Sequence, residues 1–238
     1  MGRNIFEKSI SSGLFIMIGL IFLGVFIKSA VTSLKSYDRV VSVKGLAEKE
    51  VPANRVIWPV VYKEIGNDLM TLYKSISEKN RIIIEYLKSK GLDEKEITIS
   101  APSIIDMSAE RYQSQPSPYR YNITSILTVT SDKVDLVMSI ISSQSELLQK
   151  GVALLAGDYQ YQTQFVYTLL NDIKPVMIEE ATKNAREAAE KFAKDSNSKL
   201  GKIKSANQGQ FSIVDRDANT PQIKVVRVVS TVEYMLRD

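Results

Sequence analysis

The chain has 238 residues with 31 Lys and Arg against 27 Asp and Glu, and it contains neither cysteine nor histidine. These missing residue types exclude disulfides, thiol catalysis, cysteine-based metal sites and a Ser-His-Asp triad. Residues 1–36 carry four of the basic residues and one of the acidic ones. The remaining chain is therefore close to neutral and lacks the basic excess expected of a nucleic-acid-binding domain.

The N-terminal part contains an apolar run, Ile10–Ile27, of eighteen uncharged residues, twelve of which are Ile, Leu, Phe or Val. On the membrane-insertion scale those twelve contribute about −4 to −7 kcal/mol, and a helix of this length spans about 27 Å. We therefore expect residues 1–36 to form a signal anchor with a transmembrane helix and a linker. Basic residues flank the run on both sides, so charge alone does not orient it. The position of the run at the N-terminus favours export of the domain that follows it. One alternative is that the segment is cleaved and the domain is released into the periplasm. Another is that the domain stays anchored and faces the cytoplasm.

The remaining residues, 37–238, alternate between strand-like and helix-like patterns. Strands are predicted at residues 41–47, 56–65, 97–105, 121–130, 152–166, 202–214 and 223–236. The strand 152–166 is expected to be interrupted near Gly157 and Asp158. Helices are predicted at residues 69–87, 134–141 and 171–198. This order predicts an α+β fold, with a mainly antiparallel sheet and amphipathic helices packed on one side. The length suits one domain or two small intertwined lobes.

Two details of this pattern predict a close contact between a helix and a sheet. Gly45 interrupts the first strand and indicates a bulge or a close approach of another backbone. The last helix carries an alanine-rich stripe, and its inner face is expected to comprise Ile178, Ala181, Ala185, Ala188 and Phe192.

Tyrosines form the candidate interaction surface. Tyr159 and Tyr161 are expected on one face of the strand 152–166, and three more, Tyr112, Tyr119 and Tyr121, lie around a proline-containing loop. Such aromatic surfaces bind glycans or other subunits. The ordinary alternative is that tyrosine simply favours half-buried strand positions.

Acidic residues give only weak indications of chemistry. Asp215, Asp217 and Asn219 match the first positions of a calcium loop, but Thr220 replaces the required glycine and Val226 the final glutamate. A polar turn between two strands, without a metal, is expected there. A carboxylate-dependent hydrolase would need two acids facing one cleft. The nearest acidic clusters are Glu48, Glu50, Asp106 and Glu110.

The order of several motifs resembles the SIMPL-domain family. The matching segments are Val43-x-Gly45, Val51–Arg55, Tyr119–Thr130, the alanine-rich run Ala181–Lys199 with the following Leu200-Gly201 step, and Val225–Leu236. The resemblance covers residues 39–237. The resemblance implies export to the periplasm or envelope. It implies no catalytic activity and no site residues. Some members of the family are associated with stress protection.

Together these features predict a membrane-anchored, extracytoplasmic and non-catalytic protein without a cofactor. We expect it to form a homo-oligomer or to bind an envelope protein or a glycan, and not to bind nucleic acid. The alternatives are an envelope hydrolase and a membrane-tethered domain facing the cytoplasm.

Overall fold

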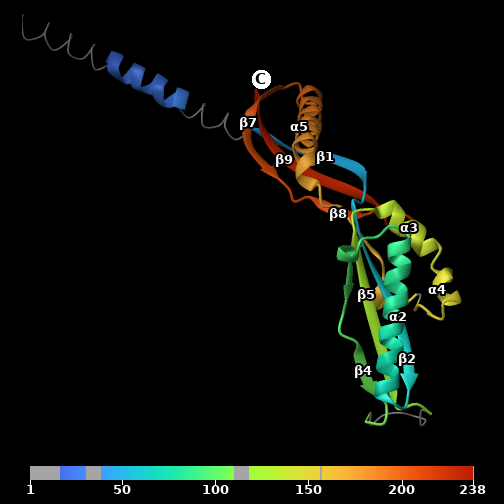
Figure 1. Cartoon of the computed structure of the whole chain (residues 1–238). Helices are drawn as coiled ribbons and strands as arrows, with labels where there is room; N and C mark the ends of the chain where they lie inside the picture. The colour runs from blue at the N-terminus through green and yellow to red at the C-terminus, as the bar shows by residue number, and fades with distance from the viewer. Residues whose placement is uncertain (1–16, 31–38, 110–117, 156, 238) are drawn as a thin grey trace, which may run out of the picture. The chain divides into compact units, whose positions relative to one another are not determined.

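The computed structural model describes residues 17–30, 39–109, 118–155 and 157–237. The chain divides into two compact units, each assembled from segments far apart in the sequence (Figure 1). Unit 1 comprises residues 1–49, 174–212 and 227–238, and unit 2 comprises residues 50–173 and 213–226. The α+β class with antiparallel strands is confirmed, but the strands form two sheets where the sequence predicts one.

The first sheet has the strand order β1–β9–β7, and β8 also pairs with β9. These strands are β1 (Val40–Pro52), β7 (Lys199–Gln208), β8 (Ser212–Asp215) and β9 (Ile223–Arg237). In unit 1 the long helix α5 (Leu170–Asp195) lies on this sheet (Figure 1). The core between them comprises Val43, Ala185, Ala189, Val232 and Tyr234.

The helix backbone of α5 lies directly on β1 at Gly45. A Cβ atom added to Gly45 would lie 1.8 Å from the carbonyl oxygen of Ala181 and 2.4 Å from the backbone nitrogen of Ala185. No side chain fits into this space, so the expected close approach at Gly45 is confirmed.

The buried stripe of α5 agrees with the predicted one at Ala181 and Ala185 and differs from it elsewhere. Its fully buried residues follow each other at intervals of four: Met177, Ala181, Ala185, Ala189 and Ala193. Phe192, which was assigned to the inner face, is 61% exposed. The contact at Gly45 explains the difference, because so short a separation admits methyl groups and excludes a phenyl ring.

Unit 2 contains the second sheet, with strand order β3–β5–β2–β6 and β4 also paired to β5. Its strands are β2 (Arg55–Gly66), β3 (Ile97–Ile99), β4 (Ser103–Asp106), β5 (Tyr121–Ser131) and β6 (Gln164–Val166). Its helices are α2 (Leu69–Ser89), α3 (Val134–Ser142) and α4 (Ser145–Gln149), with short 3₁₀ turns at Glu94–Glu96 and Tyr159–Tyr161. Figure 1 shows α2 running along the long β2–β5 pair.

The long β2–β5 pair forms the centre of the sheet in unit 2. Its register runs from Val56 opposite Ser131 to Gly66 opposite Tyr121. Side chains from both strands, including Val60 and Leu127, form a core with α2, α3 and α4. The N-cap of α2 is Asp68, whose carboxylate accepts a hydrogen bond of 2.8 Å from the backbone N–H of Thr71. The predicted strand at 121–130 and the helix from Leu69 are therefore confirmed.

A proline within a strand favours an edge position or a bulge, and Pro59 of β2 lies at an edge. The short strand β6 pairs with β2 only from Arg55 to Ile57, so Pro59 lies beyond the end of β6 on that edge. On the other side of β2, Pro59 lies opposite Thr128 of β5.

Three predicted strands are wrong in their extent. The strand 97–105 is divided into β3 and β4, since Pro102 lies between them and cannot donate a backbone hydrogen bond. The strand 202–214 is likewise divided into β7 and β8. Most of 152–166 is not a strand: Gly157 has a φ of +83°, a 3₁₀ turn follows, and only β6 pairs as a strand of the sheet.

The predicted membrane segment is only partly within the described residues. Residues 17–30 are helical, and their large apolar side chains, such as Phe22 and Phe26, are exposed. Residues 10–16 lie outside the described residues. Within the described ranges, no helix reaches the length and apolar character required of a membrane span.

Candidate functional site

A cleft in unit 2 brings together residues from three distant parts of the chain. It consists of two pockets of about 420 Å³ and 600 Å³ that share Gln162, Thr163, Asp215 and Pro221 in their linings. These volumes fall within the range of about 300–1,000 Å³ that is usual for small-molecule sites. We refer to the two pockets together as the cleft.

One wall of the cleft is the segment 157–166. Asp158 opens the 3₁₀ turn there: its carboxylate accepts a hydrogen bond from the backbone N–H of Gln160 at 3.0 Å. Its carbonyl oxygen accepts another from the N–H of Tyr161 at 3.1 Å. The chain then enters β6, which pairs with β2 and fixes this wall to the sheet.

The opposite wall is the turn between β8 and β9. The carboxylate of Asp217 closes it by accepting hydrogen bonds from the backbone N–H groups of Asn219 and Thr220 at 2.8 Å and 2.9 Å, and one from the Thr220 hydroxyl. These bonds, led by that of the hydroxyl, lower the pKa of Asp217 to about 2. Arg216 adds an ion pair with Glu50 at 3.3 Å. The turn is therefore held by its own side chains.

A nearly buried ion pair lies at the end of this wall. Lys224 is only 7% exposed, and its ammonium group is paired with the half-exposed carboxylate of Asp215. Both residues line the smaller pocket. The floor of the larger pocket includes Pro59 and Trp58, the chain's one tryptophan.

The side chains that remain available for a ligand are amides and hydroxyls. Within the described part of the chain, the side-chain amides of Gln160, Gln162 and Gln164 form no hydrogen bond with another protein group, and each of the three residues is exposed. All three line the smaller pocket, together with Thr163. The charged side chains of the cleft, in contrast, already have partners in the protein.

The predicted tyrosine surface is split between two ends of the β2–β5 pair. Tyr159, 87% exposed, and the half-buried Tyr161 line the cleft, but they lie on the 3₁₀ turn and not on one face of a strand. Tyr121 pairs with Gly66 at the other end of β2, about 30 Å away along the strand. Tyr119 is near Tyr121, and Tyr112 lies outside the described residues.

The candidate calcium loop has another role. Asp215 pairs with Lys224, and the carboxylate of Asp217 is used to close the turn. Within the described ranges, no cluster of three or more His, Cys, Asp or Glu side chains could hold a metal ion.

Of the acids considered for hydrolysis, the three that lie within the described residues are each paired with an arginine. Glu48 lies 3.7 Å from Arg227, Glu50 lies 3.3 Å from Arg216, and Asp106 lies 2.9 Å from Arg120. The Arg120 guanidinium, which donates to Asp106, lowers the pKa of Asp106 to about 2. A group that stays ionised above this pH is poorly suited to act as a general acid. Glu110 lies outside the described residues.

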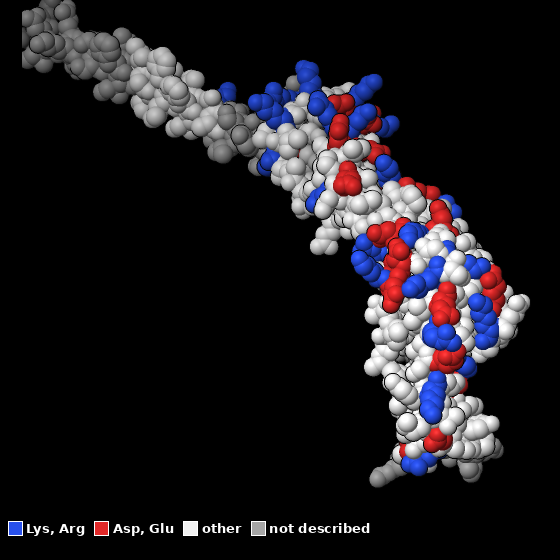
Figure 2. Space-filling model, in the orientation of Figure 1, with Lys and Arg blue, Asp and Glu red and all other residues white. Residues whose placement is uncertain are grey.

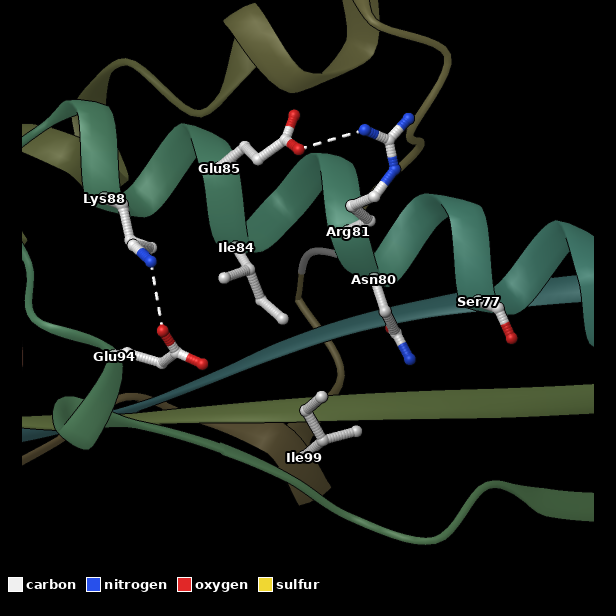
Figure 3. A pocket seen from close by; sticks show the side chains of 8 residues that line it. All are labelled: Ser77, Asn80, Arg81, Ile84, Glu85, Lys88, Glu94 and Ile99. Carbon is white, nitrogen blue, oxygen red and sulfur yellow. Dashed lines mark hydrogen bonds and ion pairs between the residues drawn. The ribbon is translucent and has the colours of Figure 1, made fainter.

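A further pocket of about 590 Å³ lies between α2 and β3 (Figure 3). Its rim consists of ion pairs within the protein, Arg81–Glu85 at 3.0 Å and Lys88–Glu94 at 3.0 Å, and Ile84 and Ile99 point between them. Acidic and basic side chains also alternate along the visible face of unit 2 (Figure 2). This pattern is that of a solvated helix surface, so the cleft is the stronger candidate site.

The α+β fold and the motif order together define the class to which the chain belongs. The model of the SIMPL family, described as a protein of unknown function (DUF541), matches residues 41–233. The match covers most of the chain, and the chain therefore belongs to the SIMPL family. A comparison with curated proteins found no match.

The acid sensitivity of the turn beside the cleft provides a test of its geometry. The folded-state pKa of Asp217 is lowered to about 2 from its usual 3.8, so its stabilising effect is present above pH 4 and is lost as the pH falls towards 2. We expect Asp217→Asn to be less stable than the wild type at pH 6, with a difference that disappears near pH 2. Urea unfolding followed by Trp58 fluorescence measures this difference.

The hydroxyl of Thr220 provides the control for this measurement. Thr220→Ala removes the largest cause of the lowered pKa, so it should shift the loss of stability to a higher pH. A stability difference between Asp217→Asn and the wild type that stays constant from pH 6 to pH 2 would contradict the described turn.

Proposed function

We propose that the chain is a membrane-anchored, extracytoplasmic binding protein and that the cleft of unit 2 is its ligand site. The observation that carries this proposal is the set of amide and hydroxyl side chains in the cleft that have no hydrogen-bond partner among the described residues. A pocket with a few convergent polar groups is the usual form of a small-ligand site.

Binding is favoured over catalysis by the groups that surround the cleft. The chain has no imidazole and no thiol, and the Asp215 carboxylate is paired with Lys224. The described candidate acids of a hydrolase, Glu48, Glu50 and Asp106, are paired with arginines. Among the described groups named here, each charged side chain is engaged by another, which disfavours a role in proton transfer.

The membrane anchor is supported by the apolar run Ile10–Ile27 and by the helical conformation of residues 17–30. We expect the domain to face outward from the cytoplasmic membrane. Protease added to intact spheroplasts should then digest residues 40–237. If these residues resist digestion until the membrane is lysed, the orientation is reversed.

Self-association is a further part of this proposal. A single membrane helix concentrates copies in two dimensions, and β7 is an edge strand of its sheet. Sedimentation of the full chain in detergent should show a defined oligomer at tens of micromolar protein, whereas a monomer alone would contradict it. Loss of the oligomer in the double variant Tyr159→Ala, Tyr161→Ala would locate the interface at the cleft rim.

A link to stress protection, which the family resemblance implies, also stays a prediction. A strain without the protein should survive oxidative or heat stress less well than a complemented strain. Equal survival of the two strains would remove this part of the proposal.

Hydrogen exchange tests the ligand site itself. The full chain in nanodiscs is compared with and without a solubilised envelope fraction from cells that lack the protein. We expect slower exchange in segments 158–166 and 213–224, and unchanged exchange in α2, which carries the other pocket. Protection confined to α2, or no protection in either place, would contradict the cleft as the ligand site.

A further inference from the structure

The charges of the cleft determine which ligands it disfavours. Three charged side chains line it: Asp158, Asp215 and Lys224. Lys224 is paired with Asp215, and the carboxylate of Asp158 accepts the hydrogen bond from Gln160. Among the described residues of the lining, no cation is free for a phosphate or carboxylate ligand, and their net charge of −1 disfavours anions. An uncharged ligand fits this arrangement.

The polar side chains of the cleft determine which neutral ligands it favours. Each glutamine amide offers two donor hydrogens and an acceptor oxygen, and the Thr163 hydroxyl both donates and accepts. Gln160, Gln162 and Gln164 place three such amides within one pocket of about 420 Å³. Sugar hydroxyl groups also donate and accept, so an oligosaccharide can satisfy a row of these groups.

An exposed aromatic ring at the cleft adds the apolar part of such a site. Tyr159 is 87% exposed and lines the same pocket as the three glutamines. An exposed tyrosine presents an apolar face beside a polar hydroxyl. The C–H face of a pyranose ring can stack on that face while its hydroxyl groups reach the amides.

A peptide added as a strand is the alternative ligand, and the geometry disfavours it. The edge available beside the glutamines is β6, which is only three residues long. Strand addition derives its affinity from main-chain hydrogen bonds, and so short an edge supplies few of them.

We propose that the cleft binds an uncharged oligosaccharide, with the glutamine amides on its hydroxyl groups and Tyr159 stacked on a sugar ring. This inference rests on the proposed function, because it names the ligand class of the same cleft.

Trp58 makes the inference directly measurable. It is the chain's one tryptophan, it is 5% exposed, and it lines the larger pocket, which shares Gln162 and Thr163 with the smaller one. Its emission therefore reports on a ligand that reaches this shared part of the cleft. The full chain is reconstituted in nanodiscs, since glycoside detergents would compete. It is titrated with a panel of neutral tetrasaccharides of hexose or N-acetylhexosamine, with a cationic glucosamine tetrasaccharide, and with a neutral octapeptide of Ser, Thr and Gln.

We expect a saturable change in Trp58 emission with at least one neutral tetrasaccharide and weaker or no binding of the octapeptide. Tyr159→Ala should weaken saccharide binding about tenfold, which corresponds to about 1.4 kcal/mol. The double variant Gln162→Ala, Gln164→Ala should weaken it as well. The control Tyr73→Ala removes another exposed tyrosine, 65% exposed and on α2, and should leave binding unchanged.

Binding of the octapeptide without any neutral saccharide overturns the inference, as does saccharide binding that Tyr159→Ala and Tyr73→Ala weaken equally. If hydrogen exchange shows the cleft protected by envelope material while no neutral saccharide binds, this inference fails and the proposed function stands. Failure of both measurements rejects both proposals.

Discussion

Replacing Gly45 by valine is expected to prevent unit 1 from forming its native core. A Cβ at this position would overlap with the backbone of α5 at Ala181 and Ala185, and backbone cannot move aside as a flexible side chain can. Overpacking of a core usually costs about 1–3 kcal/mol, and a clash with backbone exceeds this range. We therefore expect a loss of more than about 3 kcal/mol, seen as a lower unfolding temperature and rapid proteolysis of α5.

Gly66→Ala is the matched control for this variant. Its added Cβ would lie 3.2 Å from a methyl carbon of Leu72, a side chain that can shift. We expect a stability change below about 1 kcal/mol in this case. Similar stability of the Gly45→Val protein and the Gly66→Ala protein would show that α5 does not lie on β1 as described.

Removal of Asp215 is expected to have the second-largest effect. Asp215→Ala leaves the ammonium group of Lys224 nearly buried and without its partner. Breaking a buried ion pair costs about 3–5 kcal/mol. Because Asp215 is half exposed, we expect a smaller loss of about 1–3 kcal/mol, measured by urea unfolding followed through Trp58 fluorescence.

The double variant Asp215→Ala, Lys224→Met separates this cause from a general loss of packing. Methionine retains most of the lysine stem and carries no charge, so more than half of the lost stability should return. If the two substitutions instead cost the sum of their separate effects, the ion pair has no energetic role.

The parts of the fold that could be predicted from sequence are those with a long regular pattern. The alternation in Tyr121–Ser131 and the three- and four-residue spacing of Leu69–Leu87 each identify an element without further information. Gly45 also indicated its close contact, because a glycine within a strand needs a reason. The face of α5 could not be predicted, since Phe192 and the alanines fit more than one rotation of the helix about its axis.

The strand prediction for residues 152–166 is wrong for a physical reason. The tyrosines and β-branched residues of this segment favour a strand, but the positive φ at Gly157 and the Asp158 cap turn the chain before β6 begins. Gly157 and Asp158 indicate the interruption in the sequence, but not that only Gln164–Val166 form a strand of the sheet. The five-residue helix α4 is too short to show any periodicity.

The cleft was only partly predictable. Tyr159 and Tyr161 were candidates, whereas Trp58, Asp215 and Lys224 come from distant segments that only the fold brings together. Lys224 did carry a signal. It lies two and four residues before the buried Val226 and Val228 in β9, so the alternation of a strand places all three side chains on the same face. A buried lysine is therefore expected there.

The most direct test of the cleft as the ligand site is a cross-link formed in living cells. The photoreactive residue p-benzoylphenylalanine replaces Tyr159 in the full chain, and a second strain carries it at Tyr73 of α2 as the control. Both side chains are more than half exposed, so the main difference between them is their position. We predict that illumination yields a discrete adduct with an envelope component from position 159 and not from position 73. Adducts of equal yield from both positions, or none from position 159, would contradict a ligand site in the cleft.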